Sequence, residues 1–336
     1  MDKITVVGTT AWGTTLAILL AKKYPDVWLL APTEEGAATL NSDRKNQKRL
    51  PDITFPATLK VTAALDKAFE RCQLVVIAVP SQTMRRNMQN IRDFIPKSTI
   101  IMSASKGIEI DTGLRMSSVI QITSGIDDPS HICVLSGPNL SREIARGQPS
   151  ATVVACSNLE TAEEVRNAVM TTNFRAYSAT DVIGVELAGA LKNIIAMGAG
   201  VNDGWGYGYN SKAAFLTRGL AEITRLGIAA GANTLTFLGL AGLGDLVATS
   251  SSPLSRNRRV GEELAKGRSV DDILSTLGSV AEGVPTAKAA RQLAYELGVT
   301  MPITEAMYKV LYEGYDIRTA ARELMEREPK SELEGL

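Results

Sequence analysis

The chain has few cysteines and almost no histidine. Its three cysteines, Cys72, Cys133 and Cys156, stand far apart among 336 residues, and the sequence holds no CxxC pair or Cys/His cluster. This spacing argues against a disulfide framework and against a zinc site, and it is typical of a protein in a reducing cytoplasm. The single histidine, His131, lies apart from the other candidate residues. We therefore expect it to be structural, and chemistry that depends on histidine is disfavoured.

Net charge is also lacking, because 36 Lys and Arg balance 36 Asp and Glu. This balance gives no sign of a nucleic-acid partner or of a membrane-surface protein. Residues 4–21 carry no charge, which a signal peptide or anchor would also show, but Gly and Thr interrupt the run at 8–10 and 13–15. A strand, a tight turn and a helix explain these residues better. We expect a cytoplasmic protein without an integral membrane segment.

The first half of the chain alternates between two kinds of pattern. A helical pattern covers 14–23 and another covers 83–94, whereas 33–66 is polar and irregular and is expected to be rich in loops. Strands that alternate with helices predict an α/β fold with a Rossmann-like, doubly wound, mostly parallel sheet. The predicted strands are short, apolar runs at 4–7, 27–30, 74–79, 99–103, 132–135, 151–155 and 174–177.

The strand pattern stops near residue 180. We therefore expect two domains, residues 1–180 with the sheet and residues 181–336 as an all-α domain. The helices predicted in the second domain cover 181–201, 211–230, 259–265, 270–276, 287–297, 302–312 and 317–326.

A glycine turn follows the first predicted strand. It runs from Gly8 to Gly13 and matches the dinucleotide fingerprint Gly-x-Gly-x-x-Gly except at the second glycine, which is Thr10. Backbone N–H groups at the start of the next helix would favour phosphates. A tight turn without a ligand is the structural alternative. The second strand ends at Ala31 and Pro32, neither acidic nor basic, and Glu34 is either a ribose ligand or an exposed carboxylate. The choice between NAD and NADP therefore stays open.

Lys192 lies in the middle of an apolar helical stretch, residues 184–201. A helix that is apolar on nearly every side is normally buried, and a buried lysine needs a partner. Desolvation would lower the pKa of Lys192 towards the range of a proton donor or acceptor. A lysine that extends to the surface from a buried stem is the alternative.

Three other places hold polar groups that suit an anionic substrate. Lys106 follows a predicted strand, where ligands bind in doubly wound sheets. A solvated loop lysine is the alternative, because it would show the same sequence pattern. Asp245 lies in a glycine-rich apolar turn and is either the partner of Lys192 or a helix cap. Ser255, Arg256 and Asn257 precede a helical pattern and could hold an anion, or form a solvated charged surface.

Taken together, the motifs resemble those of the NAD(P)-dependent glycerol-3-phosphate dehydrogenases of the soluble bacterial type. The resemblance covers essentially the whole chain. The segments that carry it are Ala11-Trp12-Gly13, Ser105-Lys106-Gly107, Ser136-Gly137-Pro138, 186–193, 242–246, 255–259 and Glu282-Gly283.

The resemblance implies roles for particular residues. It implies that Lys192 is the proton donor and acceptor. The implied substrate ligands are Lys106, Gly137, Asn139, Lys192, Asp245, Ser255, Arg256 and Asn257. The implied cofactor ligands, of which the first four belong to the glycine turn, are Gly8, Ala11, Trp12, Gly13, Lys106, Ser141, Arg256, Val280 and Glu282.

The implied activity is the reversible reduction of dihydroxyacetone phosphate to sn-glycerol 3-phosphate with NADP or NAD, for glycerophospholipid synthesis. Residues 1–180 would bind the dinucleotide and residues 181–336 the substrate, and a homodimer is the assembly considered. The chain departs from the family at Thr10, at Asn139 and at Pro32-Thr33, where a basic residue is usual. The alternatives are a dehydrogenase of small hydroxy acids with the same fold and a nucleotide sensor without catalysis.

Overall fold

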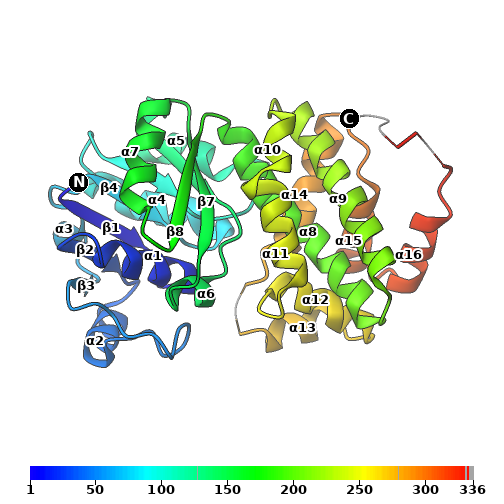
Figure 1. The fold of residues 1–336 in the computed structure, drawn as a ribbon, viewed down its shortest axis with the longest axis horizontal. Helices are drawn as coiled ribbons and strands as arrows, with labels where there is room; N and C mark the ends of the chain where they lie inside the picture. The colour runs from blue at the N-terminus through cyan, green and yellow to red at the C-terminus, as the bar shows by residue number, and fades with distance from the viewer. Residues whose placement is uncertain (127, 279, 330, 333–336) are drawn as a thin grey trace. The chain divides into compact units, whose positions relative to one another are not determined.

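The computed structural model describes residues 1–126, 128–278, 280–329, 331 and 332. The chain divides into two compact units (Figure 1). Unit 1 comprises residues 1–105 and 116–182, and unit 2 comprises residues 106–115 and 183–336. Nothing in the sequence patterns separated residues 106–115 from their neighbours, so their membership of unit 2 is an unexpected feature.

Unit 1 is built on an eight-stranded sheet in the order β3-β2-β1-β4-β5-β6-β7-β8. Neighbouring strands are parallel except β6 and β7, which are antiparallel. The predicted Rossmann-like, mostly parallel sheet is confirmed. The strands are β1 (Lys3–Val7), β2 (Asp26–Leu30), β3 (Leu59–Thr62), β4 (Leu74–Ile77), β5 (Ile100–Ser103), β6 (Ile132–Ser136), β7 (Ser150–Cys156) and β8 (Phe174–Ala179).

Helices connect these strands. Residues 33–66, expected to be rich in loops, contain long loop segments but also α2 (Glu34–Asp43), β3 and the start of α3 (Leu65–Phe69), which the sequence patterns did not indicate. The edge strand β3 has only four residues, and one of them is an exposed lysine, so its apolar signal is weak. The other helices of unit 1 are α1 (Ala11–Ala21), α4 (Met84–Ile91), α5 (Met116–Ser124), α6 (Ser141–Ala145) and α7 (Leu159–Val169), with single turns η1 (Ser81–Thr83), η2 (Arg92–Phe94) and η3 (Pro129–His131).

The sheet of unit 1 reverses its order of growth between β1 and β4. In doubly wound sheets, ligands bind beyond the carboxyl ends of the strands at such a reversal. The chain leaves β1 at Gly8 and β4 at Ala78, so these two strand ends are where a ligand of unit 1 is expected.

Unit 2 is helical, as predicted. Three elements between residues 234 and 251, which the sequence patterns did not indicate, precede α12. The elements are α8 (Val182–Gly204), α9 (Tyr209–Ala229), α10 (Thr234–Leu238), the π-helical turn η4 (Leu240–Gly244), α11 (Asp245–Ser251), α12 (Arg256–Ala265), α13 (Val270–Thr276), α14 (Gly283–Glu296), α15 (Pro302–Tyr312) and α16 (Ile317–Met325).

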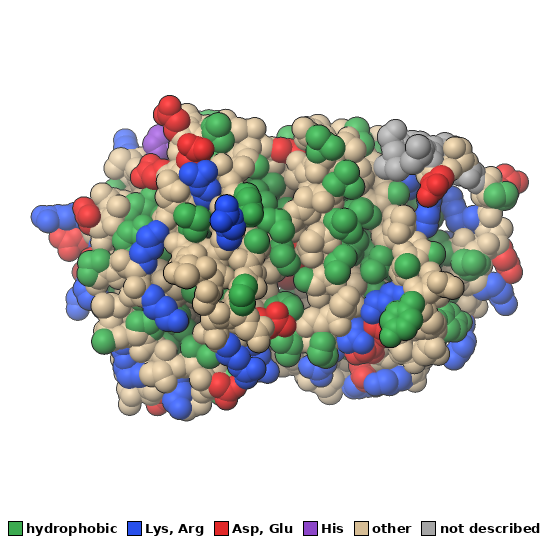
Figure 2. Space-filling model, in the orientation of Figure 1, with side chains coloured by type: hydrophobic (Ala, Val, Ile, Leu, Met, Phe, Trp, Pro, Cys, Tyr) green, Lys and Arg blue, Asp and Glu red, His purple; other side chains and the backbone are tan. Residues whose placement is uncertain are grey.

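Helix α8 is the central helix of unit 2, and every residue from Gly184 to Asn202 is buried. It is long and apolar enough to cross a membrane by length and composition, yet 89% of its most apolar window is buried inside the structure. A core helix of a soluble protein has these properties. Side chains of both charge signs are interspersed on the visible face of each unit (Figure 2).

Two glycines bring α12 against α8. A Cβ atom at Gly200 would lie 1.9 Å from the carbonyl oxygen of Arg258, and one at Gly261 would lie 1.8 Å from that of Met197. Only glycine allows the two backbones to approach so closely. This crossing fixes the start of α12 relative to the middle of α8.

Glu222 of α9 gives a stability prediction. Its buried carboxylate accepts hydrogen bonds from the N–H groups of Ile303 and Thr304, each at 2.8 Å, and from the Thr304 hydroxyl at 2.8 Å. These are donors in the first turn of α15, which has no side-chain cap of its own. We expect Glu222→Ala to lower the free energy of unfolding by about 2–3 kcal/mol, measured by urea denaturation. An unchanged denaturation midpoint would contradict this role.

Candidate functional site

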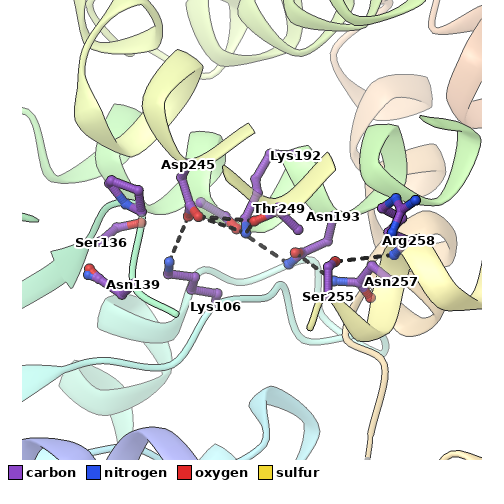
Figure 3. Close-up of polar contacts among 12 residues, drawn as sticks. Lys106, Ser136, Asn139, Lys192, Asn193, Asp245, Thr249, Ser255, Asn257 and Arg258 are labelled. Atoms are coloured by element: carbon purple, nitrogen blue, oxygen red, sulfur yellow. Dashed lines mark hydrogen bonds and ion pairs between the residues drawn. The ribbon is translucent and has the colours of Figure 1, made fainter. Parts of the chain in front are cut away.

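Lys192 is buried in unit 2 with two partners from one helix. Its side-chain nitrogen, Nζ, lies 2.9 Å from Oδ1 of Asp245, and it also donates to the hydroxyl of Thr249 (Figure 3). Lys192 is 5% exposed and Asp245 is 2% exposed. Of the two alternatives for Asp245, contact with Lys192 is the one found. Asp245 is the first residue of α11 rather than its cap.

Asp245 also holds a second lysine. The Nζ atom of Lys106 lies 2.6 Å from Oδ2 of Asp245, so each carboxylate oxygen has one ammonium partner (Figure 3). Thr249, one turn later on α11, donates to Oδ1 at 3.2 Å. A carboxylate that accepts from three groups is fixed in position, and it holds both lysines by charge-assisted hydrogen bonds.

Burial lowers the pKa of Lys192 from 10.5 to about 8. Desolvation penalises the charged ammonium, and the charges of Lys106 and Arg256 act in the same direction. The carboxylate of Asp245 opposes the shift. A lysine with a pKa near 8 can both give and accept a proton close to neutral pH.

A second polar chain links α8 to the start of α12. The side-chain amide of Asn257 donates to Oδ1 of Asn193 at 2.7 Å (Figure 3). The Oδ1 atom of Asn257 accepts from the N–H of Gly283 at 3.0 Å. Ser255 is the N-cap of α12 and accepts from the N–H of Arg258. Helix α12 therefore begins at Arg256, three residues before the predicted start.

The start of α12 suits an anion. Arg256 is the first residue of this ten-residue helix and its side chain is exposed. The backbone N–H groups of a first helical turn and the helix dipole both favour negative charge. Arg258 is engaged elsewhere, because its side chain bonds Asp203 at 2.7 Å and Glu262 at 2.8 Å.

The glycine turn of unit 1 has the geometry of a dinucleotide-binding turn. Gly8 has φ +108°, and a Cβ atom there would lie 2.7 Å from the carbonyl oxygen of Ala78. A Cβ atom at Gly13 would lie 2.1 Å from the carbonyl oxygen of Gly8. Thr10 caps α1, because its hydroxyl accepts from the N–H of Gly13 at 3.0 Å and donates to Ala78 at 2.8 Å. The departure at Thr10 therefore supports the turn.

A cavity of about 380 Å³ opens beside this turn. Its lining includes two basic residues, Lys48 and Arg49, from the polar stretch 33–66. Glu34 is exposed in the first turn of α2 and is absent from the lining. A dinucleotide fits this donor set, because backbone amides and a helix start face phosphates well. The cavity is lined by Val7–Thr10, Leu30–Pro32, Asn46, Lys48, Arg49, Val79, Pro80, Thr83 and Asn87.

The other expected residues of unit 1 lie on neighbouring elements. Ala11 begins α1, and Trp12 follows it with its ring edge-on to Phe174. Ser141 begins α6, and its carbonyl oxygen accepts from the hydroxyl of Thr15 at 3.2 Å. Within the described chain, the buried indole N–H of Trp12 has no hydrogen-bond partner, which leaves this donor available to a ligand.

Gly137 and Asn139 follow β6 in the same unit. Gly137 has φ +155°, and a Cβ atom there would lie 2.9 Å from the Cα of Thr152. The amide nitrogen of Asn139 donates to the hydroxyl of Thr152 at 3.2 Å, while its buried Oδ1 has no partner in the part of the chain that the structure describes. Asn139 thus keeps an acceptor available.

In unit 2, Val280 and Glu282 directly precede α14. Val280 is 46% exposed, and the carbonyl oxygen of Glu282 accepts from the hydroxyl of Thr286. Thr249, which contacts both Lys192 and Asp245, was not among the residues predicted from the sequence. One signal for it was available, because Thr249 is four residues after Asp245 and so on the same helix face. No group of three metal-ligating side chains occurs among the described residues.

Two family models match this chain. The NAD-dependent glycerol-3-phosphate dehydrogenase N-terminus matches residues 3–162, and the C-terminus of the same family matches residues 181–322. A glycerol-3-phosphate dehydrogenase [NAD(P)+] of Dehalococcoides mccartyi is 50% identical over 336 residues, which are 100% of this chain and 94% of the relative. One from Chlorobium phaeobacteroides is 47% identical over 98% of this chain and 99% of the relative.

A solved structure supports the same assignment. The glycerol-3-phosphate dehydrogenase of Coxiella burnetii is similar with a TM-score of 0.91 and 33% identity, over 97% of this chain and 99% of that one. The matched models, the sequence relatives and this structure agree over nearly the full length of the chain. This chain belongs to the NAD-dependent glycerol-3-phosphate dehydrogenase family of oxidoreductases.

Proposed function

We propose that this protein is an NAD(P)-dependent sn-glycerol-3-phosphate dehydrogenase that reversibly reduces dihydroxyacetone phosphate. The observation that carries the proposal is the buried Lys192, held by Asp245 and Thr249, with its pKa lowered to about 8. The family membership of the chain supports the choice of reaction. Buried ionisable pairs with a shifted pKa are characteristic of functional sites. A nucleotide sensor without catalysis would have no use for such a lysine.

In this proposal Lys192 moves the proton. When bound, the nicotinamide supplies the hydride that reduces C2 of the ketone. Lys192 donates a proton from Nζ to the C2 oxygen as negative charge develops there. Asp245 keeps Nζ in place and favours its protonated form before the transfer. In the reverse direction, neutral Lys192 accepts the hydroxyl proton of glycerol 3-phosphate.

The substrate phosphate binds at the start of α12. Arg256 and the N–H groups of the first turn hold it, with Ser255 and Asn257 on either side of Arg256. Phosphate binding supplies orientation at a distance from the reacting carbon. The remaining substrate ligands that we propose are Lys106, Gly137, Asn139, Lys192 and Asp245.

Residues 1–180 bind the dinucleotide and residues 181–336 bind the substrate in this proposal. Gly8 and the start of α1 hold the pyrophosphate. The cofactor ligands that we propose are Gly8, Ala11, Trp12, Gly13, Lys106, Ser141, Arg256, Val280 and Glu282. The test of the function is the loss of absorbance of NADH and of NADPH, measured separately, with dihydroxyacetone phosphate. If neither cofactor is oxidised while it still binds, the proposal is wrong.

The proposal extends to cellular context. Glycerol 3-phosphate formed by this enzyme would enter glycerophospholipid synthesis in the cytoplasm, and the three free, buried thiols are compatible with a reducing compartment. We include a homodimer in the proposal, and light scattering of the purified protein tests it.

The two basic residues of the cavity give a prediction about cofactor choice. Lys48 and Arg49 line the cavity together with Leu30–Pro32, the end of the second strand, where the ribose is expected to bind. We expect Lys48→Ala to raise the KM for NADPH about tenfold, the value of one charge-assisted hydrogen bond to the 2′-phosphate. The KM for NADH should change little.

The matched control for Lys48→Ala is Lys45→Ala. Lys45 belongs to the same stretch, but it is absent from the cavity lining. Steady-state kinetics with both cofactors measure the effect. A contact between Lys48 and the 2′-phosphate would be contradicted if Lys48→Ala changed the KM for NADPH and the KM for NADH by the same factor. It would also be contradicted if Lys45→Ala changed the preference between NADPH and NADH as much as Lys48→Ala does.

A further inference from the structure

Residues 106–115 form a loop of unit 2 whose ends join unit 1. A backbone bridge pairs Ile108 with Arg115, and the N–H of Glu109 donates to the carbonyl oxygen of Leu114 at 3.0 Å. Gly113, with φ +67°, makes the turn. The loop is therefore a small closed hairpin, and we call it the Lys106 loop.

Three anchors attach the Lys106 loop to the helices of unit 2. At its start, Lys106 contacts Asp245 at 2.6 Å. In its middle, Ile108 is fully buried in the apolar core that includes Leu187 of α8. At its end, Nη1 of Arg115 lies 2.6 Å from Oε2 of Glu186, with side-chain exposures of 25% and 6%. Ion pairs as buried as this one are costly to break on one side.

Glu186 connects this last anchor to the candidate catalytic lysine. It lies on α8, six residues before Lys192 and so about 9 Å along the helix axis. One rigid helix therefore carries both Lys192 and the carboxylate that holds the far end of the Lys106 loop. Because Ile108 and Arg115 are bridged, a displacement of Arg115 is transmitted to the start of the loop, where Lys106 lies.

We propose that Arg115 and Glu186 are positioning residues that hold the Lys106 loop against α8, so that Lys106 stays on Asp245 beside Lys192. This inference rests on the proposed function and adds two residues to it. Neither residue is proposed to touch the reacting atoms. Their effect on the reaction passes through Lys106.

The position of Lys106 matters to Lys192 through charge. The groups that face Lys192 are Asp245 of α11, Lys106 of the loop and Arg256 of α12. The charge of Lys106 lowers the pKa of Lys192. If Lys106 moves away, the pKa of Lys192 therefore rises, and Lys192 becomes the one lysine that is paired with Asp245. Loss of the anchor therefore has an electrostatic signature that a general loss of stability lacks.

The experiment compares Arg115→Ala with the wild-type enzyme. We expect kcat/KM for dihydroxyacetone phosphate to fall about 10- to 100-fold, because misplacement of a binding group by about 1 Å has effects of this size. The alkaline limb of the pH profile for reduction should move to higher pH. Arg115→Lys, which keeps the charge, should restore most of the activity, and Glu186→Gln should have an intermediate effect.

A double-mutant cycle with Lys106→Ala decides the mechanism. If Arg115 acts through Lys106, Arg115→Ala should change kcat/KM by less than about twofold in the Lys106→Ala background. Arg291→Ala is the matched control, since Arg291 forms an ion pair with Glu305 at 2.7 Å elsewhere in unit 2. The proposal would be overturned if the losses of kcat/KM in the two single variants multiplied in the double variant and the alkaline limb of the pH profile did not move. The Arg115–Glu186 pair would then have a merely structural role.

Amide hydrogen exchange separates this inference from the proposed function. The N–H groups of Glu109 and Gly113 are hydrogen-bonded within the loop, so faster exchange of residues 106–115 in Arg115→Ala is expected whether or not the enzyme reduces dihydroxyacetone phosphate. Unchanged exchange would overturn the anchoring itself. A wild-type protein without activity would overturn the proposed function and leave the anchoring supported by exchange alone.

Discussion

Replacement of Lys192 by alanine is expected to lower kcat for reduction of dihydroxyacetone phosphate about 10²- to 10⁴-fold, the range for loss of a general acid. The Nζ atom is the ammonium that Asp245 and Thr249 hold in the buried site. The KM for the cofactor should change little, because the proposed phosphate-binding turn of the dinucleotide belongs to unit 1. Stopped-flow and steady-state kinetics measure the effect.

Two further variants make the Lys192 result interpretable. Lys192→Met keeps the length of the side chain without its charge and guards against a collapsed cavity. Lys212→Ala is the control, since Lys212 also forms an ion pair in unit 2, at 2.8 Å from Asp203. Turnover close to the wild-type value in a folded Lys192→Met enzyme would show that another group transfers the proton.

Replacement of Arg256 by alanine is expected to lower kcat/KM for dihydroxyacetone phosphate about 100-fold or more, because each hydrogen bond between charged groups contributes about 1.5–3 kcal/mol. Unphosphorylated dihydroxyacetone should be a poor substrate of both enzymes, with nearly equal kcat/KM values. The comparison of the two substrates isolates the phosphate contact. It also distinguishes this reaction from that of a dehydrogenase of small hydroxy acids.

Arg259→Ala is the matched control for Arg256. Arg259 is exposed on the same helix, three residues later. Its loss should leave the preference for the phosphorylated substrate intact. If Arg256→Ala reduces the rates with both substrates by the same factor when the cofactor is saturating, Arg256 does not anchor the phosphate.

The sequence was sufficient for most of the sheet, and it offered the central pair of the site as one of two alternatives. Strands that are buried on both faces, such as β4, β5 and β6, appear as continuous apolar runs. Seven of the eight strands were predicted, including the partly exposed β2, β7 and β8. An isolated carboxylate and an isolated lysine in apolar surroundings each need a partner, and this reasoning led from Lys192 to Asp245. Those two inferences depend on local composition alone.

Other features depend on packing that no local pattern encodes. The edge strand β3 is short and half polar, so its signal is lost among loops. Lys48 and Arg49 look like surface residues in the sequence, and only the fold brings them to the cavity beside Gly8. The Lys106 loop lies between two segments of unit 1, and its contacts with Asp245, Glu186 and the apolar core around Leu187 assign it to unit 2.

The pH dependence of kcat in the two directions tests the role of Lys192 most directly. With a pKa of about 8, Lys192 is protonated below pH 8 and can donate, so reduction should be fast there and slow as the pH rises through about 8. Oxidation needs the neutral lysine and should accelerate over the same interval. Rates that are flat between pH 7 and 9, or that change in the same sense in both directions, would contradict a proton transfer by Lys192.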